Sequence, residues 1–275
     1  MFKSLLTERQ IGVLLLLVIA SLLPADCAAQ GPLDQPEYLP NSHAHNDYEH
    51  SSPLTDSLTL GYASIEADVW LVEGQLCVAH NRSDVDQQRR LDTLYLDPLF
   101  QRFQSQAGQI YQQREPLLLL VDFKSEGAST YAALKMLLAK YRPMLTPDSS
   151  GNVPAVKIVI SGNRPIELIR TDADRLVSID GRLRDVEGII DSSAMPLISD
   201  NWRLHFKYNG QGEMTADERV KLREIVKRVH AAKAKLRFWA TPESETLWKI
   251  LREEQVDFIG TDQLENLARF LRTAP

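Results

Sequence analysis

The stretch His43–His80 reads HAHNDYEHSSPLTDSLTLGYASIEADVWLVEGQLCVAH and concentrates potential acid, base and metal-binding groups in a short segment. Within it, Glu66 and Asp68 interrupt an otherwise apolar run that is typical of a buried strand. Residues two apart on a strand lie on the same face, with Cα atoms roughly 6.6 Å apart. Two carboxylates at this spacing can bind one hard cation, whereas without a cation their repulsion beside apolar neighbours would be costly. We therefore interpret the pair as part of a metal site.

The first 29 residues have the pattern of a signal peptide. Lys3 and Arg9 precede an apolar run from Ile11 to Leu23, and the small residues of Cys27–Ala29 follow just before Gln30. This run is shorter than the roughly 20 residues that a membrane-spanning helix needs. We expect cleavage near Gln30 and a secreted or periplasmic protein, with an uncleaved amphipathic anchor as the alternative.

The composition narrows the class of protein. After cleavage only Cys77 remains, which excludes a disulfide framework, so the fold must be stabilised by a hydrophobic core. A hydrophobic content of 44% supplies that core. The net charge of −6, without a block of like charge, argues against binding of nucleic acid.

Residues 30–275 alternate short apolar runs with helical stretches, which predicts a single α/β domain with the TIM (β/α)8 barrel fold. We expect strands at 42–45, 63–70, 117–124, 157–161, 175–179, 196–199, 236–241 and 257–261. The clearest expected helices are 93–113, 130–141, 216–234, 244–254 and 263–271. An extra short strand at Gln75–His80 is expected to pair back on the second strand through a turn at Glu73-Gly74.

Charged residues gather at the expected strand ends, where TIM barrels carry their active sites. Asp122 and Lys124 end the third strand and repeat the same-face spacing of Glu66 and Asp68. Three carboxylates favour one divalent cation of the hard type, Mg²⁺ or Ca²⁺, over Zn²⁺. Lys124 beside that cation would complete a cradle for a phosphate group.

Histidines stand at neighbouring strand ends. His43 and His45 end the first expected strand, and His80 ends the added hairpin. His45 and His80 could supply one base and one acid across a scissile P–O bond. Trp239, on the seventh strand, is either a core aromatic or a platform for substrate. Each residue alone also fits a solvated face or a structural role, and their joint placement favours function.

Several motifs resemble those of a known group of enzymes. Three motifs resemble signatures of glycerophosphodiester phosphodiesterases and of the broader phosphatidylinositol-phospholipase-C-like superfamily. These signatures are HRG, IE-x-DV and V-x-HD, and the motifs similar to them are, in the same order, His45-Asn46-Asp47, Ile65–Val69 and Val78–His80. The opening His43–Tyr48 resembles the branch named after altered inheritance of mitochondria protein 6. Val121–Lys124 resembles the strand of the sphingomyelinase-D-type branch.

The resemblance implies a TIM barrel, a divalent cation held by Glu66, Asp68 and Asp122, and His45 and His80 as the catalytic pair, with His80 as the acid. Asn46 stands where the HRG motif has the arginine that contacts phosphate. The substrate-binding candidates are Lys124, His43, Asn46 and Trp239.

Together these features predict a secreted, metal-dependent phosphoric diester hydrolase that acts on lipid-derived head-group diesters. A lipid substrate would bring transient contact with a membrane surface, and no protein partner is indicated. One alternative is a secreted barrel that binds a head group without turnover. The other is an amidohydrolase-type zinc enzyme that begins at His43-x-His45, but Ile179–Gly181 and Ser199–Asn201 lack the histidines that such a site would need at later strand ends.

Overall fold

The computed structural model describes residues 36–147, 151, 153–188 and 191–273. The expected signal peptide, residues 1–29, lies outside this part of the chain. The described residues group into one compact unit. None of the helices within the described ranges is long and apolar enough to cross a membrane.

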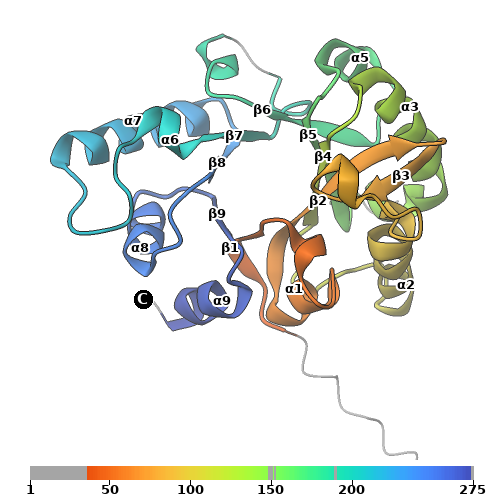
Figure 1. The fold of residues 1–275 in the computed structure, drawn as a ribbon, viewed down its shortest axis with the longest axis horizontal. Helices are drawn as coiled ribbons and strands as arrows, with labels where there is room; N and C mark the ends of the chain where they lie inside the picture. Colours follow the sequence, from red (N-terminus) through yellow and green to blue (C-terminus); the bar gives the residue numbers. More distant parts are fainter. Residues whose placement is uncertain (1–35, 148–150, 152, 189–190, 274–275) are drawn as a thin grey trace, which may run out of the picture. The chain divides into compact units, whose positions relative to one another are not determined.

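Eight parallel strands close into a barrel, which confirms the predicted fold class (Figure 1). Around the barrel the order is β1-β9-β8-β7-β6-β5-β4-β2, and β2 pairs with β1 to complete the ring. The strands are β1 (Leu39–Ala44), β2 (Tyr62–Val72), β4 (Leu117–Phe123), β5 (Val156–Gly162), β6 (Val177–Gly181), β7 (Leu197–Asn201), β8 (Lys235–Trp239) and β9 (Phe258–Thr261). All eight expected strands are found, with ends shifted by a few residues.

A hairpin extends β2 beyond the barrel, as predicted. The added strand β3 (Gln75–Val78) runs antiparallel to β2, with Val69 opposite Val78 and Val72 opposite Gln75. Glu73 (φ 49°) and Gly74 (φ 80°) form the turn, and positive φ at both positions is what the tightest hairpin turns require. Because β3 runs back along β2, the chain delivers His80 to the rim of the barrel.

Helices cover the outside of the barrel, as Figure 1 shows. They are α1 (Thr55–Leu60), α2 (Asp97–Ser105), α3 (Gly127–Leu138), α4 (Arg142–Leu145), α5 (Ile166–Thr171), α6 (Trp202–His205), α7 (Ala216–Ala231), α8 (Glu245–Glu253) and α9 (Leu264–Thr273). The helix expected at 93–113 is shorter than predicted. A π-helical segment over Asp92–Leu96 leads into α2, and the left-handed conformations of Ala107 and Gly108 stop the helical path soon after Ser105.

Two apolar layers support the polar end of the barrel. The larger core lies mainly between the strands and the helices. A smaller cluster includes Leu118, Leu120 and Val159. Nearer the carboxyl end, Asp122 follows Leu120 on the same face of β4, and Ser161 follows Val159 on the same face of β5. The barrel is therefore apolar lower down and polar at its carboxyl end.

Candidate active site

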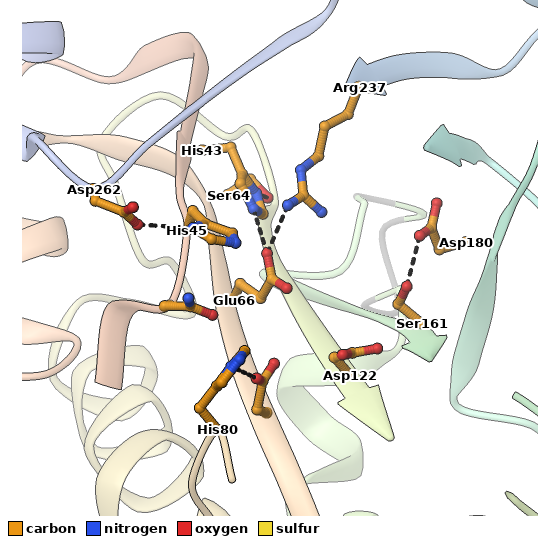
Figure 2. Close-up of polar contacts among 12 residues, drawn as sticks. His43, His45, Ser64, Glu66, His80, Asp122, Ser161, Asp180, Arg237 and Asp262 are labelled. Carbon is orange, nitrogen blue, oxygen red and sulfur yellow. Dashed lines mark hydrogen bonds and ion pairs between the residues drawn. The ribbon is translucent and has the colours of Figure 1, made fainter. Parts of the chain in front are cut away.

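Three carboxylates converge at the carboxyl end of the barrel. The register aligns Asp68 on β2 with Asp122 on β4, and Glu66 lies two residues earlier on the same face of β2. One oxygen from each of Glu66, Asp68 and Asp122 lies within 4.8 Å of the others. The expected convergence is therefore confirmed, and Figure 2 shows Glu66 and Asp122 facing the same space. Among the described residues, this candidate ligand group contains no histidine.

Asp68 has one crowded oxygen and one unpartnered oxygen. Its Oδ2 accepts a hydrogen bond from the Tyr48 hydroxyl at 2.7 Å and lies 2.9 Å from His80 Nδ1 and 3.0 Å from Lys124 Nζ. Its Oδ1 is buried and has no hydrogen-bond partner among the residues that the structure describes. Burial, followed by the nearby charge of Glu66, raises the pKa of Asp68. A buried, unpartnered carboxylate oxygen fits a position that binds a cation.

Asp122 forms an ion pair with Lys124 on the same strand. Burial of the Lys124 ammonium opposes its charge, but Asp122 and Asp68 outweigh this effect and raise the pKa of Lys124, which keeps it protonated. Space for the Asp122 carboxylate depends on Gly162, the residue paired with Phe123 across β4 and β5. A Cβ atom at Gly162 would lie 2.2 Å from Asp122 Oδ1.

Glu66 is held as an anion by two buried neighbours. Its Oε2 lies 2.9 Å from His43 Nε2 and accepts a hydrogen bond from Arg237 Nη2 at 2.7 Å. Burial acts to raise the pKa of Glu66, but the charge of Arg237 and the contact with His43 outweigh it and hold the pKa well below its usual value. Arg237 was not predicted as a site residue. The sequence feature that could have indicated Arg237 is its position as a charged residue between Leu236 and Phe238 in an apolar strand.

His43 is completely buried behind Glu66. Its Nδ1 lies 2.7 Å from Ser64 Oγ, so both ring nitrogens have protein partners. Burial, and after it the charge of Arg237, lowers the pKa of His43 to about 3, so the ring is neutral. The prediction that His43 binds substrate does not match this geometry, because neither nitrogen faces open space. The residue instead fixes the position of the Glu66 carboxylate.

His45 lies where β1 and β9 end. Its Nδ1 is 2.7 Å from Asp262 Oδ1, and its side chain is 34% exposed. Burial opposes a charge on His45, but the hydrogen bond that the ring donates to Asp262 and the charge of Glu66 outweigh it and raise the pKa of His45. With Nδ1 engaged by Asp262, the Nε2 atom is the one left for proton transfer.

His80 borders the carboxylate cluster from the hairpin side. Its Nδ1 lies 2.9 Å from Asp68 Oδ2 and 3.3 Å from the Tyr48 hydroxyl, and its side chain is 48% exposed. Figure 2 shows His45 beside Glu66 and His80 further along the same rim. Each histidine thus has one nitrogen fixed by a carboxylate, which is the arrangement used to orient acid–base histidines.

The remaining predicted residues occupy the rim. Trp239 is 39% exposed and lines a shallow pocket together with His45 and Asp262, which places it at the mouth of the barrel rather than in the core. Asn46 has a left-handed backbone (φ 47°), and its Oδ1 lies 2.9 Å from the Tyr48 hydroxyl. Asn46 therefore orients Tyr48, a contact that sequence reasoning missed.

The structure is thus a closed TIM barrel with carboxylates and histidines at its carboxyl end, the end at which enzymes of this fold carry their active sites. The family described as the AIM6-like phosphodiesterase domain matches residues 38–180, slightly more than half of the chain. The chain belongs to this family, and the predicted resemblance is confirmed.

Curated relatives agree with this assignment, and solved structures share the fold. Altered inheritance of mitochondria protein 6 of Eremothecium gossypii is 29% identical over 269 residues, covering 83% of this chain and 68% of the relative. The homologue from Arthroderma benhamiae is 27% identical, covering 81% of each chain. Glycerophosphodiester phosphodiesterases from Parabacteroides distasonis and Agrobacterium tumefaciens share the fold, with TM-scores of 0.53 and 0.51. Their sequences are 12% and 14% identical to this one. The matches cover 86% and 85% of this chain and 99% of each solved structure.

Proposed function

We propose that this protein is a secreted or periplasmic, divalent-metal-dependent phosphoric diester hydrolase that acts on lipid-derived head-group diesters. The observation that carries the proposal is the convergence of Glu66, Asp68 and Asp122 within 4.8 Å, with two carboxylate-oriented histidines at the same rim. The expected signal peptide supports export.

The charge of the site suits a diester. Glu66, Asp68 and Asp122 carry three negative charges, and Lys124 and Arg237 carry two positive charges, which leaves a net charge of −1. A divalent cation would bring the total to +1, the complement of a phosphodiester monoanion. The net negative charge of these five groups opposes binding of an anionic diester, so their charge favours a cation between the three carboxylates.

The three carboxylates would hold Mg²⁺ or Ca²⁺, which prefer oxygen ligands. The buried Oδ1 of Asp68 fits this role, because it has no hydrogen-bond partner among the described residues and a bound cation would satisfy it. When bound, the cation supplies positive charge to the non-bridging phosphoryl oxygens. Lys124, protonated and half-buried, adds a second positive group on the same side.

Proton transfer is assigned to the two histidines. His45, oriented through Nδ1 by Asp262, accepts the proton of the attacking group at Nε2. His80, oriented through Nδ1 by Asp68, donates a proton from Nε2 to the departing alcohol oxygen. Tyr48 holds the Asp68 carboxylate in place, and His43 and Arg237 do the same for Glu66. Trp239 and Asn46 lie at the rim, where a head group would enter.

The test is hydrolysis of bis(p-nitrophenyl)phosphate and of a panel of glycerophosphodiesters and lysolipids by mature protein. We expect turnover with Mg²⁺ or Ca²⁺, and complete loss with EDTA that is reversed by added metal. Glu73→Gln, which changes an exposed carboxylate in the hairpin turn, is the matched control and should keep full activity. Full activity after exhaustive chelation would overturn the metal assignment. No turnover of any diester, combined with measurable head-group binding, would favour the binding barrel.

A further inference from the structure

The carboxylate that orients His45 has little support from contacts of its own side chain. Asp262 directly follows β9, and its side chain is 61% exposed. Within the described ranges its carboxylate makes a single hydrogen bond, to His45 Nδ1 at 2.7 Å, as Figure 2 shows. An exposed carboxylate with one partner has several rotamers open to it. Its direction toward His45 therefore depends on where the main chain places residue 262.

Glu243 holds that part of the main chain. Its Oε1 accepts a hydrogen bond from the Asp262 N–H at 2.8 Å, and its Oε2 accepts one from the Thr261 hydroxyl, also at 2.8 Å. Thr261 Oγ1 in turn accepts a hydrogen bond from the Gln263 N–H at 2.8 Å. The turn that follows β9 is thus tied to one carboxylate, directly at two residues and through Thr261 at the third.

The same turn also supports the main chain of His45. The His45 N–H donates a hydrogen bond to the Thr261 carbonyl oxygen at 3.1 Å. Both the backbone of His45 and the carboxylate that binds its ring are therefore attached to the Thr261–Asp262 unit. A shift of this unit would change the contact between His45 Nδ1 and Asp262 Oδ1.

The local structure brings Glu243 to this place at a cost. Ala240 follows the end of β8 with a left-handed φ of 56°, which is unfavourable for a residue with a Cβ. Partial burial of the carboxylate raises the pKa of Glu243 despite its two hydrogen bonds, and the like charge of Asp262 acts in the same direction. Local choices that work against stability are expected where a residue serves a site.

We propose that Glu243 is a positioning residue, which fixes the Thr261–Asp262 turn and through Asp262 orients the ring of His45. This inference rests on the proposed diester hydrolase function and adds a residue to its machinery. Glu243 moves no proton in this role, because its whole effect on the reaction passes through Asp262.

The experiment is a double-mutant cycle on Glu243 and Asp262, with kcat for bis(p-nitrophenyl)phosphate as the readout. The leaving group of this substrate needs no acid, so kcat reports on His45. Asp262→Ala should lower kcat on the order of 10²–10⁴-fold, and Glu243→Ala on the order of 10-fold. Because Glu243 acts through Asp262, the double variant should be no slower than Asp262→Ala, whereas independent effects would multiply.

Glu243→Gln separates hydrogen bonding from charge. Its amide oxygen can still accept a hydrogen bond from the Asp262 N–H, and its amide N–H can donate to Thr261 Oγ1, because a hydroxyl oxygen accepts two hydrogen bonds. This variant should keep kcat close to the wild-type value. Glu245→Ala is the matched control, because Glu245 is exposed and makes no hydrogen bond to the turn in the described part of the chain. It should leave kcat unchanged.

Multiplied losses in the double variant would overturn the inference, as would wild-type kcat in Glu243→Ala or equal losses in Glu243→Ala and Glu243→Gln. Glu243→Asp, which keeps the charge but is one methylene shorter, takes the place of Glu243→Ala if that variant does not fold.

If wild-type protein hydrolyses no diester, the proposed function fails, and crystal structures of the variants decide the inference on Glu243. Loss of the Asp262–His45 contact in Glu243→Ala, together with its retention in Glu243→Gln, would uphold the inference. Any other combination of the two structures would refute it.

Discussion

Replacing Gly162 by alanine should disturb the proposed metal site, although Gly162 is not one of its ligands. Gly162 lies at the end of β5 with φ +66°, and its added Cβ would lie 2.2 Å from Asp122 Oδ1. The same Cβ would lie 2.5 Å from the Phe123 carbonyl oxygen. Carbon and oxygen atoms that are not bonded need more than 3 Å, so the Asp122 carboxylate must move by about 1 Å.

The expected magnitude follows from these two distances. A left-handed conformation costs a residue with a Cβ about 1–2 kcal/mol, and the overlap with the Phe123 main chain adds to that cost. A displacement of about 1 Å in a catalytic constellation lowers turnover on the order of 10²-fold. We therefore expect Gly162→Ala to lose about two orders of magnitude in kcat and to require more Mg²⁺ or Ca²⁺ for half-maximal activity.

Gly74→Ala separates backbone strain from the effect on Asp122. Gly74 has a similar φ of +80°, but a Cβ there meets nothing within 4 Å. It should lower the unfolding temperature by about 2–8 °C, the result of 1–2 kcal/mol in a domain of this size, and leave diester hydrolysis unchanged. Activity and metal dependence are measured below both unfolding temperatures. A folded Gly162→Ala protein with wild-type turnover and metal requirement would show that the position of Asp122 does not matter.

The other predictions concern the proposed acid–base and metal residues. His45→Ala and His80→Ala should each lower turnover of natural diesters on the order of 10²–10⁴-fold. With p-nitrophenyl diesters, only His80→Ala should regain activity, because their leaving group needs no acid. If His45→Ala regains activity instead, the two histidines have the opposite roles. Glu66→Ala should abolish metal binding in calorimetry together with activity, and retained binding would remove it from the ligand set. Asp262→Asn should shift the acidic limb of kcat/KM to lower pH, because Asp262 raises the pKa of His45, which must be neutral to act as a base; an unmoved limb would contradict this.

The order of the elements could be predicted from the sequence because parallel strands in a barrel are covered on both faces. The run Leu117–Val121 is continuously apolar and buried, and a series of such runs separated by helical patterns fits few folds other than a parallel sheet covered by helices. The exit from the helix expected at 93–113 could not be predicted in the same way. It ends near Ser105, where Ala107, a strong helix former, and Gly108 both adopt left-handed conformations; Gly108 is a helix-stop signal that the prediction to residue 113 overlooked.

The carboxylate cluster could be predicted because its residues lie two apart on adjacent strands, so that strand periodicity alone brings them to one face. The supporting contacts could not. Arg237 is 171 residues from Glu66, and Asp262 is 217 residues from His45, and only closure of the barrel brings each pair together. The different directions of His43 and His45 could not be predicted from periodicity either, because β1 ends at Ala44 and the left-handed Asn46 follows. His45 therefore turns toward Asp262 while His43 points inward to Glu66.

Glu66 and Asp68 have the same chemistry and the same strand face, but their surroundings shift their pKa values in opposite directions. Arg237 and His43 overcome the effect of burial at Glu66 and keep it anionic, whereas burial and the charge of Glu66 raise the pKa of Asp68. A proton therefore binds to Asp68 before Glu66 as the pH falls, and a cation at the cluster competes with that proton. In the proposed metal site, Glu66 would thus be the ligand fixed in charge and position, and Asp68 the one whose charge depends on what occupies the site. Because Asp68 Oδ2 also lies 2.9 Å from His80 Nδ1, a cation in the proposed metal site would affect the position of the proposed acid.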